Sequence, residues 1–164
     1  MKSIILFRHG QAQNGWLYED YDRPLTHSGV LEADKMGHHL SGKNESPDLV
    51  ITSSAIRAMT TAEIAIVSGN WDCPLHTKSE IYGGPPLFLL SLIKKQNNKY
   101  STICLVGHEP NFSSFITLLT DIPKVIFPTA SMVRIDFNVV RWNDVIVGFG
   151  NLAWILSPGE LSSM

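Results

Sequence analysis

The sequence has few cysteines, no long apolar run and almost no excess charge. Cys73 and Cys104 are its two cysteines, one in a polar stretch and the other in the apolar run TICLV. A disulfide framework is not expected, because small disulfide-stabilised domains are dense in cysteine. No apolar stretch approaches the roughly 20 residues of a membrane span, and Arg8 interrupts the N-terminal run before it reaches signal-peptide length. We expect a cytoplasmic protein that binds no membrane.

The balance of charge also excludes some partners. Thirteen Lys and Arg residues against fifteen Asp and Glu residues give a formal net charge of −2. Broad affinity for nucleic acid or anionic lipid is not expected at that charge. With 164 residues, 44% hydrophobic and 17% charged, the composition is typical of one globular domain spanning residues 1–164.

Short apolar runs alternate along the chain with segments of helical periodicity. The pattern predicts strands at 3–7, 48–54 and 101–107, helices at 26–42, 55–69, 85–98 and 109–121, and β-rich pieces at 131–137, 144–150 and 151–156. Thr26 or Ser28 is expected to cap the first helix, with Val30, Leu31, Met36 and Leu40 on its apolar side. The alternation predicts an α/β three-layer sandwich with a mostly parallel central sheet and a C-terminal antiparallel hairpin.

Residues with related chemistry follow the three predicted buried strands. Arg8-His9-Gly10 ends the first strand, Ser53-Ser54 and then Arg57 follow the second, and Gly107-His108 ends the third. In open α/β sheets, ligands bind outside the carboxyl ends of the strands, where the connecting loops converge. Two arginines and two histidines at one edge predict an anion site.

These residue types suit phosphoryl transfer. The planar guanidinium of Arg8 or Arg57 matches phosphate oxygens, and helix N-termini add free N–H groups. A neutral imidazole is a competent nucleophile toward phosphorus, and adjacent cations hold its pKa down. His9, between Arg8 and Gly10, is the better nucleophile candidate, and His108 is expected to donate a hydrogen bond to a phosphoryl oxygen.

The motifs also carry a family resemblance. FRHG, SSAIRAMTTAE and VGHEPN resemble the histidine phosphatase (phosphoglycerate mutase-like) superfamily. RPLTHSG, SEIYGGPP and the closing LAWILSP, together with the short chain, resemble the bacterial SixA-type phosphohistidine phosphatases. The likeness spans nearly the whole chain, with its motifs in matching order.

The resemblance implies a mechanism and a class of substrate. His9 would become a phosphohistidine that water hydrolyses, while Arg8, Arg57 and His108 hold the phosphoryl oxygens, with no metal and no organic cofactor. Relatives that act on larger substrates carry long insertions over the site, and this chain has little room for one. The pocket should therefore be open. An open pocket suits a phosphorylated protein, such as a histidine-containing phosphotransfer domain. Glu80 falls where many relatives place a proton-donating acid; the alternative is an ordinary loop carboxylate.

Several assignments stay open. Gln11 and Asn14 are candidates for the pocket mouth or for turn positions, and the aromatic loop 16–21 either contacts a partner protein or packs on itself. Ser131 is a weaker candidate for the pocket. Four other histidines show no metal-ligand spacing and are expected at the surface: His27, His38, His39 and His76. The alternative functions are a phosphatase for small phosphomonoesters and a non-catalytic module that binds a phosphorylated ligand.

Overall fold

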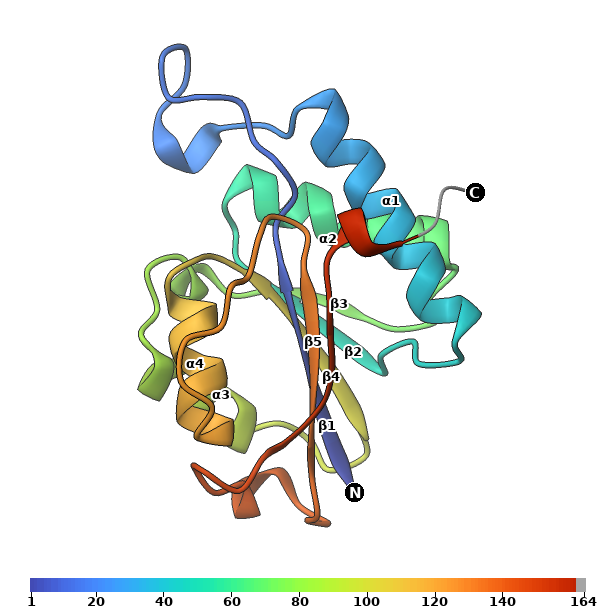
Figure 1. Ribbon diagram of the computed structural model, residues 1–164, viewed down its shortest axis with the longest axis vertical. Coiled ribbons are helices and arrows are strands. Elements are labelled where there is room, and N and C mark those ends of the chain that lie inside the picture. The colour runs from blue at the N-terminus through green and yellow to red at the C-terminus, as the bar shows by residue number, and fades with distance from the viewer. Residues whose placement is uncertain (162–164) are drawn as a thin grey trace.

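The computed structural model describes residues 1–161 and is built around one six-stranded sheet (Figure 1). The strands are β1 (Lys2–Arg8), β2 (Leu49–Thr52), β3 (Leu75–Thr77), β4 (Thr102–Gly107), β5 (Met132–Phe137) and β6 (Asn151–Leu156). Their order across the sheet is β3-β2-β4-β1-β5-β6. The first four strands run parallel, and β5 and β6 are antiparallel additions at one side. The predicted mostly parallel α/β fold is therefore confirmed.

Helices cover both faces of this sheet. They are α1 (His27–Gly42), α2 (Ile56–Gly69), α3 (Pro86–Lys94) and α4 (Asn111–Thr120), with short 3-10 turns η1 (Asp20–Asp22), η2 (Ser79–Ile81), η3 (Trp142–Asp144) and η4 (Pro158–Glu160). Helices α1 and α2 lie together on one face, and α3 and α4 lie on the other (Figure 1). No helix within residues 1–161 is long and apolar enough to cross a bilayer.

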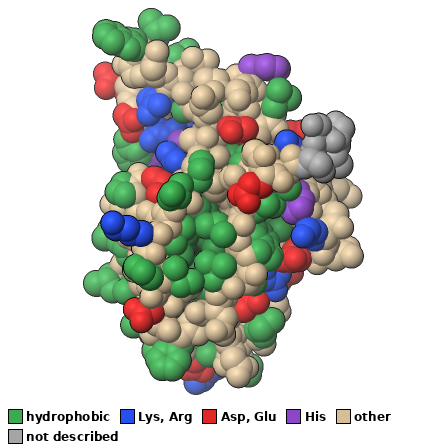
Figure 2. Space-filling model, in the orientation of Figure 1, with side chains coloured by type: hydrophobic (Ala, Val, Ile, Leu, Met, Phe, Trp, Pro, Cys, Tyr) green, Lys and Arg blue, Asp and Glu red, His purple; other side chains and the backbone are tan. Residues whose placement is uncertain are grey.

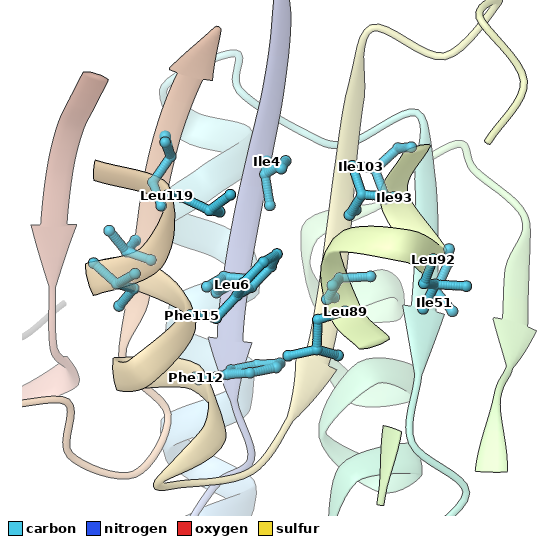
Figure 3. Packing of buried hydrophobic residues seen from close by; sticks show 14 of the residues in the cluster. Ile4, Leu6, Ile51, Leu89, Leu92, Ile93, Ile103, Phe112, Phe115 and Leu119 are labelled. Atoms are coloured by element: carbon cyan, nitrogen blue, oxygen red, sulfur yellow. The ribbon is translucent and has the colours of Figure 1, made fainter. Parts of the chain in front are cut away.

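The central strand β1 contains the unbroken apolar run Ile4–Phe7 because helices cover it on both sides. Ile4 and Leu6 belong to the core cluster shared with α3 and α4, while Ile5 and Phe7 belong to the cluster shared with α1 and α2. Figure 3 shows Ile4 and Leu6 on the side of the sheet that carries α4. Successive side chains of a strand point to opposite faces, so burial on both faces requires an unbroken apolar run.

The first helix has the predicted cap and only part of the predicted buried face, since Met36 and Leu40 are buried. The side chain of Thr26 accepts a hydrogen bond from the backbone N–H of Gly29 at 3.0 Å. Val30 and Leu31 were predicted to be buried and instead are 37% and 55% exposed. The reason is the close approach of α1 to α2, where a Cβ on Gly37 would lie 2.5 Å from the carbonyl oxygen of Ala65. Small residues therefore form this contact, Met36 and Leu40 reach the core beside it, and Val30 and Leu31 point outward.

The C-terminal part also differs from the prediction. Residues 144–150 were predicted as a strand, but they form the end of η3 and an irregular loop. The backbone N–H groups of Gly148 and Gly150 donate to Leu118 and Leu119 of α4, so they are not available to a strand partner. Gly148 also has φ of +80°, which breaks an extended run. Strand β3 was not predicted, because its three residues, Leu75–Thr77, are too few and too polar to give a signal.

The sheet brings the ends of three parallel strands into line. Arg8, the last residue of β1, pairs with Gly107, the last residue of β4. Thr52, the last residue of β2, pairs with Val106 of β4. The residues that follow these three strands therefore emerge side by side at one edge of the sheet, beneath the loop after β1 that forms the upper end of the molecule in Figure 1.

Candidate active site

His9 is a buried imidazole at the end of β1. Its backbone N–H donates to the carbonyl oxygen of Gly107 at 3.1 Å, and Gly10, the next residue in the chain, fixes the orientation of its side chain. The ring Nδ1 lies 2.7 Å from the carbonyl oxygen of Gly10. A carbonyl only accepts, so Nδ1 carries the proton and donates it, which leaves the lone pair on Nε2. The tautomer presents the nucleophilic nitrogen to the site.

The surroundings of His9 also keep the ring neutral. Burial, followed by the positive charges of Arg57 and Arg8, lowers the pKa of His9 to about 4. Burial disfavours the charged imidazolium, and the two guanidinium groups repel it. Near neutral pH the Nε2 lone pair is therefore available for attack on an electrophile.

Arg57 lies in the first turn of α2 and faces His9. Its Nε lies 3.4 Å from His9 Nε2, and the side chain is only 7% exposed. Its backbone carbonyl accepts a hydrogen bond from Thr61 Oγ1 at 2.7 Å, and the same hydroxyl accepts from the backbone N–H of Gly10 at 3.0 Å. Thr61 thus joins the first turn of α2 to the residue next to His9.

His108 follows β4 and completes the group from the third strand end. Its ring centroid is 5.3 Å from that of His9, and its Nε2 lies 2.8 Å from Ser53 Oγ. Burial, then the proximity of His9 and Arg57, lowers the pKa of His108 to about 3. Its neutral ring has one N–H to donate, and the hydroxyl of Ser53 is able to adapt to either tautomer.

Arg8 leaves β1 on the same edge, and its Nη1 donates to the carbonyl oxygen of Phe127 at 3.0 Å. Within residues 1–161, three buried side-chain atoms lack a hydrogen-bond partner: Arg8 Nε, His108 Nδ1 and Ser131 Oγ. Ser131 is adjacent, since its carbonyl accepts from the Arg8 backbone N–H. Each such atom costs about 1–3 kcal/mol when left unpaired. All three residues lie at or next to the edge where Arg8 pairs with Gly107, the residue before His108.

The structure therefore brings together His9, Arg8, Arg57 and His108, the four residues chosen at the strand ends. Figure 2 shows cationic side chains gathered around histidine near the upper end of the molecule, where the loop after β1 lies in Figure 1. The arrangement offers a neutral imidazole nitrogen beside two guanidinium groups and a second imidazole. It is chemically suited to attack on a phosphoryl group.

Glu80 forms its hydrogen bond and its ion pair with its sequence neighbours Ser79 and Lys78, not with the four residues at the strand ends. It is exposed in η2, where it accepts from Ser79 Oγ at 2.8 Å and pairs with Lys78 Nζ at 3.5 Å. The hydrogen bond from Ser79 is the main cause that lowers the pKa of Glu80. These contacts favour the carboxylate form, whereas a general acid must hold a proton until it reaches the leaving group.

Gln11 and Asn14 make local contacts in the loop after β1. Gln11 Oε1 accepts a hydrogen bond from Thr26 Oγ1 at 2.8 Å, and Asn14 Oδ1 accepts from the backbone N–H of Trp16 at 3.1 Å. These hydrogen bonds hold the loop after β1 and connect it to the start of α1. In the same loop, Trp16 is 89% exposed, so the loop does not fold over its own indole ring.

Sequence reasoning missed Asp20 and Tyr82. Asp20 binds Arg57 through both its backbone and its side chain, and the Tyr82 hydroxyl donates to Asp20 Oδ2 at 2.5 Å. The rings of Tyr82 and His108 meet edge to face at 5.4 Å. Tyr82, which follows η2, therefore reaches the site. For Asp20, the available signal was the acidic aromatic stretch YEDYDRP in the loop that follows the nucleophile motif.

The remaining histidines stand apart from the site. His27, His38 and His76 are exposed, as predicted, and His39 is half-buried. Across residues 1–161, no group of three or more His, Cys, Asp or Glu side chains is placed to hold a metal ion.

Comparison with known proteins agrees with this geometry. Residues 4–81 match the family model described as the histidine phosphatase superfamily, branch 1. The chain belongs to this superfamily. An uncharacterized protein of Mycobacterium tuberculosis is 31% identical over 115 residues, which cover 70% of each chain. A 2,3-bisphosphoglycerate-dependent phosphoglycerate mutase of Protochlamydia amoebophila is 40% identical over 87 residues, 47% of this chain and 36% of the mutase.

Solved structures of this histidine phosphatase fold resemble the chain over nearly its whole length. The protein histidine phosphatase SixA, solved in complex with tungstate, superposes with a TM-score of 0.79 at 22% identity, covering 98% of this chain and 99% of SixA. A phosphoserine phosphatase of Entamoeba histolytica, solved with 3-phosphoglyceric acid, gives a TM-score of 0.66 at 17% identity, with 96% and 98% of the two chains covered. At these identities the likeness describes the fold.

Proposed function

We propose that this member of the histidine phosphatase superfamily is a metal-independent phosphatase that works through a phosphohistidine at His9. The observation that carries the proposal is the buried, neutral Nε2 of His9 facing Arg57 Nε at 3.4 Å. A phosphoryl group seated between them would meet a nucleophile on one side and the Nε–H donor edge of the guanidinium on the other. Arg8 and His108 supply further donors to the phosphoryl oxygens, and Arg8 supplies positive charge that a metal ion provides in other phosphatases.

The two steps balance without a cofactor. The Nε2 lone pair of His9 forms an N–P bond as the bond from phosphorus to the leaving atom breaks and its electron pair departs with the leaving group. Water then attacks phosphorus, the N–P bond breaks, and its electron pair returns to Nε2 as inorganic phosphate leaves. Throughout, the Nδ1 proton stays on His9 in its hydrogen bond to the Gly10 carbonyl.

The substrate we propose is phosphohistidine on another protein. A phosphoimidazole protonated on its second ring nitrogen leaves as neutral imidazole, so the site has no need of a strong acid. This is consistent with Glu80, whose contacts favour the carboxylate. Trp16 and Leu17, 89% and 84% exposed in the loop after β1, offer apolar contacts to a protein surface. The tungstate bound to SixA is a tetrahedral oxyanion, which is also consistent with a phosphoryl site in this fold.

We also propose that the protein and its partner meet in the cytoplasm. Cys73 and Cys104 are both free thiols in the described structure, and burial raises the pKa of Cys73 to about 11. Free, unreactive thiols are typical of a reducing compartment.

Trapping of the intermediate tests the activity. The protein is mixed briefly with a radiolabelled phosphohistidine-containing phosphotransfer domain and quenched in base, which preserves phosphohistidine. We expect label on the wild-type chain, none on His9→Ala, and normal label on His76→Ala, an exposed histidine outside the site. Turnover should be unchanged in excess chelator.

Two outcomes would overturn the proposal. Label on His9→Ala would mean that another residue is the nucleophile. Binding of phosphorylated ligands without label or turnover would instead identify a non-catalytic module. A far higher kcat/KM for sugar phosphates than for phosphohistidine would retain the phosphatase and reject the substrate.

A further inference from the structure

The carboxylate of Asp20 lies at the edge of the site and is held there from three directions. Asp20 Oδ2 accepts from Arg57 Nη2 at 3.1 Å and from the Tyr82 hydroxyl at 2.5 Å, and Oδ1 accepts from Arg23 Nη1 at 3.0 Å. The Asp20 carbonyl oxygen also accepts from Arg57 Nη1 at 2.6 Å. These hydrogen bonds hold the 3-10 turn η1 against the side chain of Arg57.

This arrangement divides the guanidinium of Arg57 between two roles. Its Nη1 and Nη2 ends are bound to Asp20, while its Nε edge faces His9. The Arg57 side chain is 7% exposed, but that of Asp20 is 54% exposed. Asp20 therefore lies on the solvent side of Arg57, at the mouth of the site, and His9 lies on the inner side.

The charge of Asp20 is fixed by the groups that face it. The hydroxyl of Tyr82 is the main cause that holds the pKa of Asp20 far below its usual range, and Arg23 and Arg57 act in the same direction. His108 also lies within electrostatic range of Asp20, and burial keeps that ring neutral. Asp20 is therefore ionised over the whole working pH range and has no proton to donate to a leaving group.

We propose that Asp20 is a specificity-determining residue, whose fixed negative charge at the mouth of the site favours a cationic phosphoimidazole over a phosphate ester. The proposal rests on the phosphatase function and assigns the basis of its substrate choice.

The argument follows from in-line transfer. With His9 attacking from the inner side, the leaving group departs on the opposite side of phosphorus, toward the mouth where Asp20 lies. In a phosphate ester, negative charge develops on the leaving oxygen, and a carboxylate nearby opposes it. In phosphohistidine, the second ring nitrogen carries a proton and positive charge before the P–N bond breaks. A carboxylate stabilises that form, and the bond's electron pair then neutralises the ring as imidazole leaves.

The test compares two substrates on matched variants. Asp20→Asn removes the charge and keeps the shape, Asp20→Glu keeps the charge, and Asp22→Asn removes a second exposed carboxylate from the same turn. The measured quantity is the ratio of kcat/KM for a phosphohistidine peptide to that for p-nitrophenyl phosphate. We expect at least a tenfold fall of this ratio in Asp20→Asn, and a change under threefold in Asp20→Glu and Asp22→Asn.

The pH profile provides a second readout that a structural role would not move. Asp20 is expected to stabilise the protonated phosphoimidazole once it is bound, so the alkaline limb of kcat for the phosphohistidine peptide, which reports the enzyme–substrate complex, should move to lower pH in Asp20→Asn. An equal fall on both substrates with an unchanged profile would overturn the proposal, since Asp20 would then only position Arg57. Failure of the phosphatase function itself is separate, because wild type would then show no label on His9.

Discussion

Arg57 Nε lies 3.4 Å from His9 Nε2, although the two residues are 48 positions apart in the chain. The contact joins the first turn of α2 to the end of β1. In it, the Nε–H group of Arg57 points toward the lone pair on His9 Nε2. A phosphoryl group entering this gap would accept hydrogen bonds from the guanidinium while the imidazole attacks phosphorus. The geometry of this pair is the basis of the first prediction.

Replacing Arg57 with lysine should remove the fork while keeping a positive charge. The ammonium group is a single point of contact and cannot hold both Asp20 and a phosphoryl oxygen in the same way. Loss of one preorganised oxyanion donor costs about 10²–10³ in kcat, so we expect a fall of that order in steady-state kinetics. Arg141→Lys, at an exposed ion pair with Asp144, is the control and should change kcat less than twofold.

Thr61→Val should weaken both the fold and the site. Thr61 is fully buried, and its hydroxyl accepts from Gly10 N–H at 3.0 Å while donating to the Arg57 carbonyl at 2.7 Å. Valine has the same shape but leaves Gly10 unpaired, at a cost of about 1–3 kcal/mol in the free energy of unfolding. Urea unfolding measures the loss, and kcat should fall with little change in KM. Unaltered stability would show that Gly10 finds another partner.

Stability should fall as the pH is lowered from neutral. Burial lowers the pKa of His9 to about 4 and that of His108 to about 3, from the ordinary value of 6.5. Below pH 6.5 the unfolded chain binds protons that the folded protein does not, so the stabilisation present above pH 6.5 is lost on acidification. Each histidine contributes up to about 1.4 kcal/mol per pH unit in this window.

Denaturant unfolding at pH 7.5 and pH 5 measures this loss. His108→Gln should lose less stability than wild type over that interval, and His76→Gln, at an exposed position, should follow wild type. An equal decline in all three proteins would show that other groups dominate the acid response.

Gly29→Ala should destabilise the protein because two backbone segments meet there without room for a Cβ. A Cβ on Gly29 would lie 2.1 Å from the carbonyl oxygen of Gln11. Overpacking of this kind costs about 1–3 kcal/mol or more, and the shift should reach the adjacent Gly10 and lower activity. Gly42→Ala is the matched control, since its Cβ would meet no heavy atom within 4 Å. Thermal unfolding of both variants provides the comparison.

Glu80→Gln should leave turnover of a phosphohistidine peptide within about threefold of wild type, since general-acid catalysis typically contributes 10²–10⁴-fold where it operates. The exposed carboxylate is bound to Ser79 and Lys78, and those contacts favour its charged form. A hundredfold fall in kcat for this substrate would instead identify Glu80 as the proton donor.

The sequence alone predicted most of the sheet and the four residues at its edge. The run Ile4–Phe7 is fully buried, and burial on both faces of a strand requires apolar residues at every position. Polar and charged residues directly after such runs, as at Arg8, His9 and His108, stand out because the strand ends face a shared opening. These features are local, and a linear pattern is enough to reveal them.

Only the tertiary structure decided which exposed side chains meet at the mouth of the site. Asp20 lies 37 positions from Arg57 and 62 from Tyr82, and nothing in their local sequence pairs them. It also decided that Val30 and Leu31 face outward. Residues 144–150 form a loop that is hydrogen-bonded to the C-terminal end of α4 instead of forming a strand. Such outcomes depend on how closely whole elements approach each other and on which distant backbone groups are free to bond. Periodicity along the chain reports burial of a segment's face, but it contains no measure of those distances.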